Sequence, residues 1–135
     1  MPVNFDPSLI TDKVRKGVMR AIVRGTEAVK KEAIDLILSS PKTGRVYRRG
    51  GVEHRASAPG EPPASDTGRL VSSIQTKYDV QNLTGSVTAS AVYAAPLEFG
   101  TQKMEPRPFL RPAMANKRAD IEADIAAEIS RALKE

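Results

Sequence analysis

The stretch PSLITDKVRKGVMRAIVRGTEAVKKEAIDLILSS, residues 7–40, decides the fold expected for this chain. It holds no proline after Pro7, and Pro41 follows it, so the pattern predicts one long helix over residues 8–40. Apolar or small residues recur at helical spacing along one side of that helix, namely Val14, Val18, Ile22, Gly25, Val29, Ala33 and Leu36. Cations take the opposite side, namely Lys13, Lys16, Arg20, Arg24 and Lys31.

A second set of apolar side chains lies off this stripe, mostly late in the helix. Its members are candidate subunit-interface residues, namely Met19, Val23, Ile34, Ile37 and Leu38. One small domain rarely buries two sides of a helix of about 30 residues. Either these side chains pack on another subunit, or later elements of the same chain wrap around them.

Composition limits the possible chemistry. The chain has 135 residues, 40% of them hydrophobic and 27% charged, which is typical of one globular domain. It has no cysteine, which excludes disulfides, thiolate metal sites and cysteine nucleophiles. No run of about 18 apolar residues occurs, so we expect no membrane segment and no membrane partner.

The basic residues are concentrated in the first half. Residues 1–60 carry 12 Lys and Arg against 6 Asp and Glu, whereas residues 61–135 carry 9 against 10. This asymmetry indicates a polyanion or an acidic protein partner near the first half. A solvated basic face that only keeps the protein dissolved would explain it equally well.

Residues 41–66 form an extended basic and proline-rich loop or hairpin. Short strands are expected at Val46-Tyr47 and over residues 52–56, on either side of a glycine pair. Its cations are candidates for contact with DNA or with a neighbouring ring of subunits, namely Lys42, Arg45, Arg48, Arg49 and Arg55. Its prolines are further candidate interface residues, namely Pro59, Pro62 and Pro63.

Residues 67–112 contain a short helix, strands and a proline-rich turn. A helix is expected over 68–73, strands over 74–80 and 86–92 with a turn at 82–85, and a short helix from Pro96 to Gly100. A C-terminal helix is expected over 113–135. The fold class is therefore α+β, with a long N-terminal and a C-terminal helix packed on a small antiparallel sheet. The expected structural anchors are Tyr93, Phe99, Phe109 and Leu110.

Signals for catalysis are weak. The glycines at 44, 50 and 51 fit no phosphate-binding loop, and His54 has no metal-ligand partner at a suitable spacing. Four carboxylates lie in loops and at helix ends, namely Glu61, Asp66, Glu98 and Glu105. Two of them could hold a metal ion together, as in a nuclease, but helix capping and ion pairing are commoner roles for such residues. We therefore expect no catalytic residue, no metal, no cofactor and no enzymatic activity.

Two motifs carry a family resemblance. One is HRASAPGEPPASDTGRL at residues 54–70, followed by Ser73-Ile74, and the other is YAAPLEFGT at 93–101, followed by PRPFLRPA at 106–113. Their order and separation resemble the neck or tail-component family of long-tailed bacteriophages, typified by the tenth gene product of coliphage HK-ninety-seven. The resemblance covers roughly residues 50–115.

The resemblance implies a structural virion protein rather than an enzyme. Such a protein would form a ring with copies of itself, most often a hexamer, around the channel through which double-stranded DNA passes without sequence recognition. Its other partners would be adjacent neck rings, either an adaptor or stopper, or a tail terminator or tail tube. It would be assembled in the cytoplasm of the bacterial host and reside in the virion neck. The alternatives are a tail-terminator ring protein and a free-standing basic nucleic-acid-binding protein.

Overall fold

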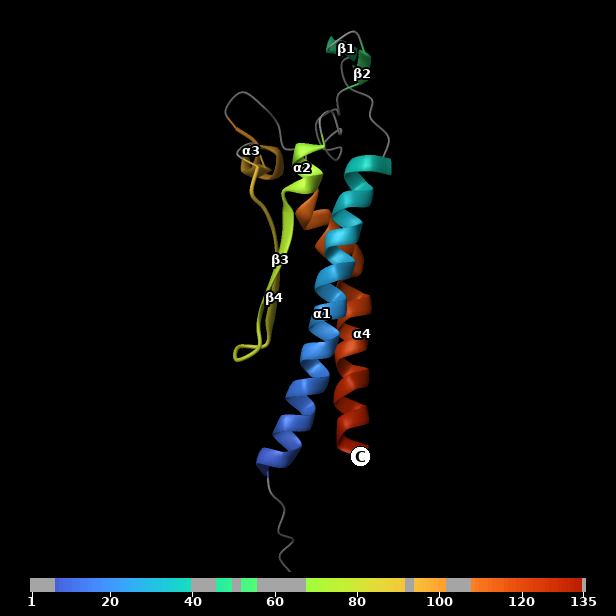
Figure 1. Ribbon diagram of the computed structural model, residues 1–135. Helices are drawn as coiled ribbons and strands as arrows, with labels where there is room; N and C mark the ends of the chain where they lie inside the picture. The colour runs from blue at the N-terminus through green and yellow to red at the C-terminus, as the bar shows by residue number, and fades with distance from the viewer. Residues whose placement is uncertain are drawn as a thin grey trace, which may run out of the picture.

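The structure is a computed structural model that describes residues 7–39, 46–49, 52–55, 68–91, 94–101 and 108–134. The elements in chain order are α1 (Pro7–Ser39), β1 (Val46–Arg49), β2 (Val52–Arg55), α2 (Arg69–Ser72), β3 (Ile74–Asp79), β4 (Thr84–Ala89), α3 (Ala94–Phe99) and α4 (Leu110–Lys134). The fold is α+β, as the sequence predicts. Figure 1 shows α1 and α4 side by side and antiparallel, with the β3–β4 hairpin along α1.

The closest contact between α1 and α4 runs along small residues. A methyl group added to Gly25 would lie 2.8 Å from Cγ1 of Ile121, and one added to Gly17 would lie 3.2 Å from Oε2 of Glu128. The absence of side chains at these glycines therefore sets the separation of the two helices.

This contact line corrects the predicted helix face. The buried row of α1 is Gly17, Ala21, Gly25, Val29, Ala33 and Ile37. Val14, Val18 and Ile22, the three N-terminal members of the predicted stripe, are only half-buried. The observed row shares Gly25, Val29 and Ala33 with the predicted stripe, and toward the N-terminus of α1 it continues through the small residues Ala21 and Gly17 instead of the valines.

The β3–β4 hairpin has an antiparallel register from Ile74 opposite Ala89 to Asp79 opposite Thr84. Its turn occupies residues 80–83, two residues earlier than predicted, because the Asp79 carboxylate accepts hydrogen bonds from the backbone N–H and the side-chain amide of Asn82. The predicted alternation along β4 is confirmed, since Val87 is half-buried between exposed neighbours.

The hydrophobic core lies at one end of the helix pair. It joins α1, α2, β3, α3 and α4 through Val29, Ala33, Ile37, Leu70, Ile74, Ala94, Phe109 and Ala113. Figure 1 shows α2 and α3 beside this end, whereas the hairpin tip stops short of the other end, where α1 and α4 continue past it without another described element. Among the described residues, the N-terminal half of α1 therefore has less apolar surface packed against it.

Most element boundaries agree with the sequence. α1 is shifted by one residue. α3 begins at Ala94 rather than Pro96 and is terminated by Gly100, which has a φ of 79° and donates its N–H to the carbonyl of Pro96 at 2.7 Å. The short basic strands are confirmed as an antiparallel pair, with Arg48 opposite Glu53 and Tyr47 opposite His54. α4 begins at Leu110 rather than Ala113, because Pro112 fits within the first turn of a helix.

Candidate partner-binding surface

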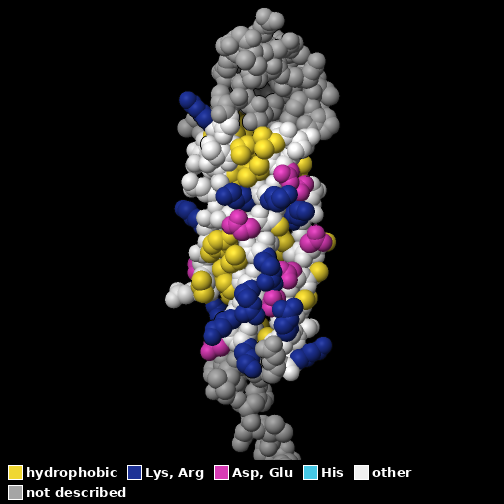
Figure 2. Space-filling model, turned by 45° about the vertical axis from the view of Figure 1, so that its right-hand side comes forward, with side chains coloured by type: hydrophobic (Ala, Val, Ile, Leu, Met, Phe, Trp, Pro, Cys, Tyr) yellow, Lys and Arg dark blue, Asp and Glu magenta, His cyan; other side chains and the backbone are white. Residues whose placement is uncertain are grey.

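An open groove of about 720 Å³ lies on the N-terminal half of α1, which we call the α1 groove. Its lining combines α1 with the hairpin tip and consists of Asp12, Arg15, Lys16, Met19, Arg20, Val23, Arg24, Val80 and Leu83. The α1 members are spaced three and four residues apart, so they share one face of the helix. Figure 2 shows Lys and Arg gathered over this part of the molecule, beside an apolar patch.

The floor of the α1 groove is apolar and accessible. Met19 and Leu83 are half-buried, whereas Val23 is 37% and Val80 66% exposed. Met19 and Val23 are two of the interface residues predicted from sequence. Across the described part of the chain, no other side chain covers this floor, so it offers apolar surface to a second molecule.

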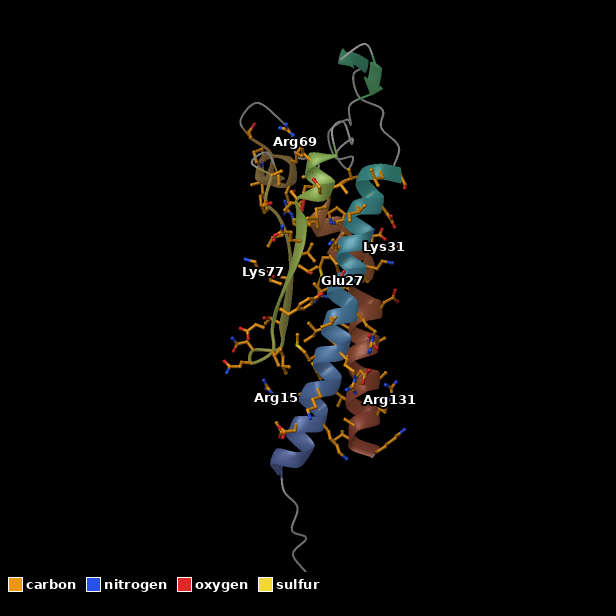
Figure 3. The ribbon with its side chains drawn as sticks, in the orientation of Figure 1. Arg15, Glu27, Lys31, Arg69, Lys77 and Arg131 are labelled. Atoms are coloured by element: carbon orange, nitrogen blue, oxygen red, sulfur yellow. The ribbon has the colours of Figure 1, made fainter. Side chains whose placement is uncertain are left out.

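Arg15 fixes one wall of the groove. Its guanidinium donates hydrogen bonds to the backbone carbonyls of Val80, at 3.3 Å, and of Gln81. Figure 3 shows Arg15 reaching from α1 toward the hairpin tip. The tip is thereby held against the helix, and Leu83 is held beside Met19 and Val23.

Leu83 has an unusual backbone conformation. Its φ is 51°, in the left-handed region, and it is the only residue other than glycine with a positive φ in the described ranges. A side chain there costs about 1 kcal/mol relative to the right-handed conformation. Asparagine or glycine fits this backbone conformation better. The presence of leucine therefore indicates that its apolar side chain contributes to the surface that it lines.

The opposite rim is tied to α4 by ion pairs. Arg24 donates to both carboxylate oxygens of Asp124 at 2.9 Å and to Oε1 of Glu128 at 2.6 Å, and Arg20 donates to Oε2 of Glu128 at 3.2 Å. The hydrogen bonds from Arg24 are the main reason that the pKa values of Asp124 and Glu128 lie below their usual range. The Glu128 side chain is 2% exposed, whereas those of Arg20 and Arg24 are 57% and 50% exposed.

A second open cleft, of about 570 Å³, lies between α1, α4 and the hairpin. Leu83 also lines this cleft, together with apolar residues of all three elements, including Ile22, Val87 and Ile125. Hydrogen bonds from Thr76 and Tyr78 to Glu27 hold the hairpin to α1 beside it, and the bond from Tyr78 lowers the pKa of Glu27. The hairpin is therefore attached to α1, while the space between it and α4 stays open.

Three of the other predicted interface residues lie outside both the α1 groove and the second cleft. Leu38 is 58% exposed near the end of α1, and Ile34 is half-buried against the core. Ile37 is 1% exposed and belongs to the core of its own chain, which corrects its assignment to an outer face. The wrapping alternative thus accounts for Ile37, whereas Val23 and Leu38 keep accessible apolar surface.

The predicted structural anchors differ in how deeply the structure buries them. Phe109 is fully buried and Leu110 packs against the core, as expected. Phe99 is 66% exposed, with the guanidinium of Arg111 4.8 Å from its ring centre, so it does not anchor the core of its own chain. Tyr93 lies outside the described residues.

Glu98, considered from sequence as a possible metal ligand, has a structural role. Its buried carboxylate accepts hydrogen bonds from the backbone N–H groups of Phe109, Leu110 and Arg111 at 2.8–3.0 Å. These donors begin α4 and have no partner within the helix. The two halves of the second family motif are thus joined by this carboxylate.

The predicted DNA-contact residues lie mostly beyond the described side chains. Lys42 and Arg45 lie outside the described residues, as do Pro59, Pro62, Pro63 and the carboxylates Glu61, Asp66 and Glu105. Arg48, Arg49 and Arg55 lie on the β1–β2 hairpin, where Arg49 is opposite Val52 and Arg55 opposite Val46.

Sequence reasoning missed the combination that forms the α1 groove. It identified Met19 and Val23, and it placed Lys16, Arg20 and Arg24 on the side opposite the main apolar stripe without joining the two sets. Their spacing to Met19 and Val23 was the available signal. The contribution of Val80 and Leu83 could not be read from it, because these residues lie about 60 positions along the chain from the α1 face.

Within the described ranges, no three acidic or histidine side chains come together in a way that could hold a metal ion. Nor does any described helix have the length and apolarity needed to cross a membrane. Comparison of the chain with models of protein families, with curated proteins and with solved structures finds no match.

Proposed function

We propose that this chain is a structural subunit of a bacteriophage neck, which assembles with copies of itself into a ring around the DNA channel between head and tail. A hexamer is the expected ring, and adjacent neck rings and double-stranded DNA are the expected partners. The proposal starts from the two sequence motifs and adds what the described surface can support.

The observation that supports it most directly is the incompletely covered surface of the helix pair. The core occupies one end, while Val23, Leu38 and Val80 remain accessible and two open clefts flank α1. The β3–β4 sheet has two strands, and in the described part of the chain neither strand pairs with a third. A subunit that closes a ring needs such surfaces on two sides, because each interface joins two different patches.

The described contacts of the second motif serve the fold, which is consistent with a motif shared by a family of structural proteins. Glu98 and Phe109 belong to the second motif, and both stabilise the start of α4. The motif is therefore explained without a catalytic role. A structural subunit of an assembly needs residues that stabilise its fold, but it needs no catalytic site.

Native mass spectrometry and negative-stain microscopy test the proposal. The purified chain, alone and mixed with tailless heads and headless tails, is expected to form closed rings or to join one of these particles. Leu38→Ser should weaken assembly, whereas Leu133→Ser, at a similarly exposed leucine of α4, serves as the matched control. A chain that stays monomeric with both particles present would overturn the proposal.

The particle that captures the chain also separates the ring alternatives. Capture by tails alone would favour the tail-terminator assignment, and capture by heads alone would favour a position next to the head. Mass spectrometry of purified virions checks the expected location in the neck.

The basic half of α1 favours a second candidate, a free-standing nucleic-acid-binding protein. Residues 11–24 carry five cations and one carboxylate. Such a protein would bind duplex DNA as a monomer, and its affinity would fall steeply with salt because each phosphate contact releases counterions. Gel-shift titrations at two salt concentrations test this, and binding weaker than micromolar by the lone subunit would exclude it.

A further inference from the structure

We propose that the α1 groove binds an acidic amphipathic helix of a protein partner. The inference goes beyond the neck role, because it follows from the chemistry of the groove in any assembly that the chain joins. It specifies one ligand class, a helix with apolar side chains on one face and carboxylates along its flanks.

The length and spacing of the groove fit a helix. Its α1 lining runs from Asp12 to Arg24, which corresponds to about 18 Å along the helix axis. Met19 and Val23 form the apolar line, and Lys16 and Arg20 flank it one turn apart. A partner helix of about three turns could place its own apolar face on this line, as in other helix-in-groove complexes.

The positive charge along the rim of the α1 groove favours a partner helix with acidic side chains on its flanks. Four cations line the groove against the single carboxylate of Asp12. The Arg20 and Arg24 side chains are about half exposed although they also bind α4 carboxylates, and Lys16 has no partner among the described residues. Each guanidinium carries five N–H donors, so Arg20 keeps donors for a second carboxylate.

The ion pairs within the molecule already join the groove arginines to carboxylates on a helix. Arg20 and Arg24 already bind Asp124 and Glu128, which project from a neighbouring helix. A partner on the other side of the same arginines would repeat this arrangement. The resulting pairs would extend the existing network across α1.

The apolar floor distinguishes a peptide from DNA. Duplex DNA would be bound by cations through its phosphates, without need of accessible Val23 and Val80 or of a leucine in a left-handed conformation. Leu83 is held beside the floor by the Arg15 contacts to the hairpin tip. This prearranged apolar wall favours an apolar helix face as the occupant.

Fluorescence anisotropy with the full chain provides the test. The probe is a labelled synthetic helix of about four turns, with leucines along one face and glutamates on its flanks. One comparison peptide carries lysine in place of glutamate, and another has the same composition in scrambled order. We expect the acidic amphipathic probe to bind at least tenfold more tightly than either, and added salt to weaken its binding.

Two groove variants and one matched control locate the site. Lys16→Glu should weaken binding by about tenfold, whereas Lys77→Glu, at an exposed lysine on the far side of the hairpin (Figure 3), should leave it unchanged. Leu83→Asn removes the wall but suits the left-handed backbone, so it should weaken binding while the melting temperature stays within about 3 °C of the parent.

The inference is overturned if the scrambled peptide binds equally well, if Lys16→Glu binds like the parent, or if a duplex oligonucleotide binds more tightly than the acidic probe. Native mass spectrometry of the same variants separates this result from the neck proposal. A Lys16→Glu chain that still forms rings but no longer binds the probe supports the groove assignment. A parent chain that binds the probe but forms no ring would count against the neck role alone.

Discussion

At the residue scale, Glu98 joins two segments through backbone groups. Its carboxylate lies at the positive end of the α4 helix and accepts three N–H groups that would otherwise be unsatisfied. The backbone carbonyl of Glu98 also accepts a hydrogen bond from Arg111 at 3.1 Å. The start of α4 is therefore determined by one side chain located 12 residues earlier.

Replacement of Glu98 tests this role. We expect Glu98→Ala to lower the free energy of unfolding by about 3 kcal/mol, because buried N–H donors lose a charged acceptor. Urea denaturation measures the change. Glu122→Ala is the control, because Glu122 forms an exposed pair with Arg118 and should contribute less than about 1 kcal/mol. Equal losses in both variants would contradict the capping role.

The two phenylalanines of the second motif provide another comparison. Phe109→Ala should cost about 3–5 kcal/mol because it leaves a cavity in the core. Phe99→Ala removes a mostly exposed ring and its contact with Arg111, so we expect a loss below about 1 kcal/mol. Thermal unfolding of both variants measures the difference, and a parent-like melting temperature for Phe109→Ala would disprove its placement.

At the element scale, α1 and α4 are joined differently along their length. Near the core, apolar side chains such as Ala33 and Ala113 meet in the same cluster. Toward the other end, Glu128 is buried against Gly17 and is paired with three arginines, Arg20, Arg24 and Arg131. This end of the helix pair therefore depends on ionised carboxylates.

That dependence predicts a response to acid. Folding lowers the pKa values of Asp124 and Glu128, so their contribution to stability is present above the ordinary carboxyl pKa of about 4 and is lost as the pH falls through the lowered values. Chemical denaturation between neutral pH and pH of about 2 measures the loss. Glu128→Gln should reduce the pH dependence, whereas Glu122→Gln should preserve it. A parent-like pH dependence in Glu128→Gln would contradict this role.

At the scale of the whole molecule, the core and the candidate binding surface occupy opposite halves of α1. Val29, Ala33 and Ile37 pack in the core, whereas Met19 and Val23 line the α1 groove. One continuous helix thus connects the packed end to the open end. Binding in the groove would add to the end of the molecule that has the fewer apolar contacts of its own.

Hydrogen exchange measures this division. Backbone amides of residues 29–37 should exchange more slowly than those of residues 14–23, because opening the core end exposes more apolar surface. Mass spectrometry of deuterated peptides resolves the two halves. Uniform protection along α1 would contradict the division.

The sequence predicted the elements better than it predicted their contacts. Helical spacing and bounding prolines located α1, and alternation located β4, because both signals are local. The burial of Ile37 and the exposure of Phe99 were not predicted, since hydrophobicity alone does not say which side of an element the rest of the chain covers. The buried row was predicted in part: Gly25, Val29 and Ala33 lay on the expected stripe, whereas Gly17 and Ala21 were not included in it.

The candidate site was predictable only in part. Met19 and Val23 stood out as surplus apolar residues, but the groove needs Leu83 and the Arg15 contacts, which link positions 65 and 66 residues apart. No local pattern encodes such a contact. The left-handed conformation of Leu83 was likewise unexpected, because Asn82 beside it is the residue type that usually adopts it.

The antiparallel course of α1 and α4 brings the start of one helix and the end of the other to the same end of the molecule (Figure 1). Because the chain has no cysteine, thiols introduced at these two places can be labelled without background. A pair of spin labels there would report helix separation by dipolar spectroscopy. The same labelled protein could then be followed as a free subunit and inside a larger particle, so that any splaying of the helices is recorded directly.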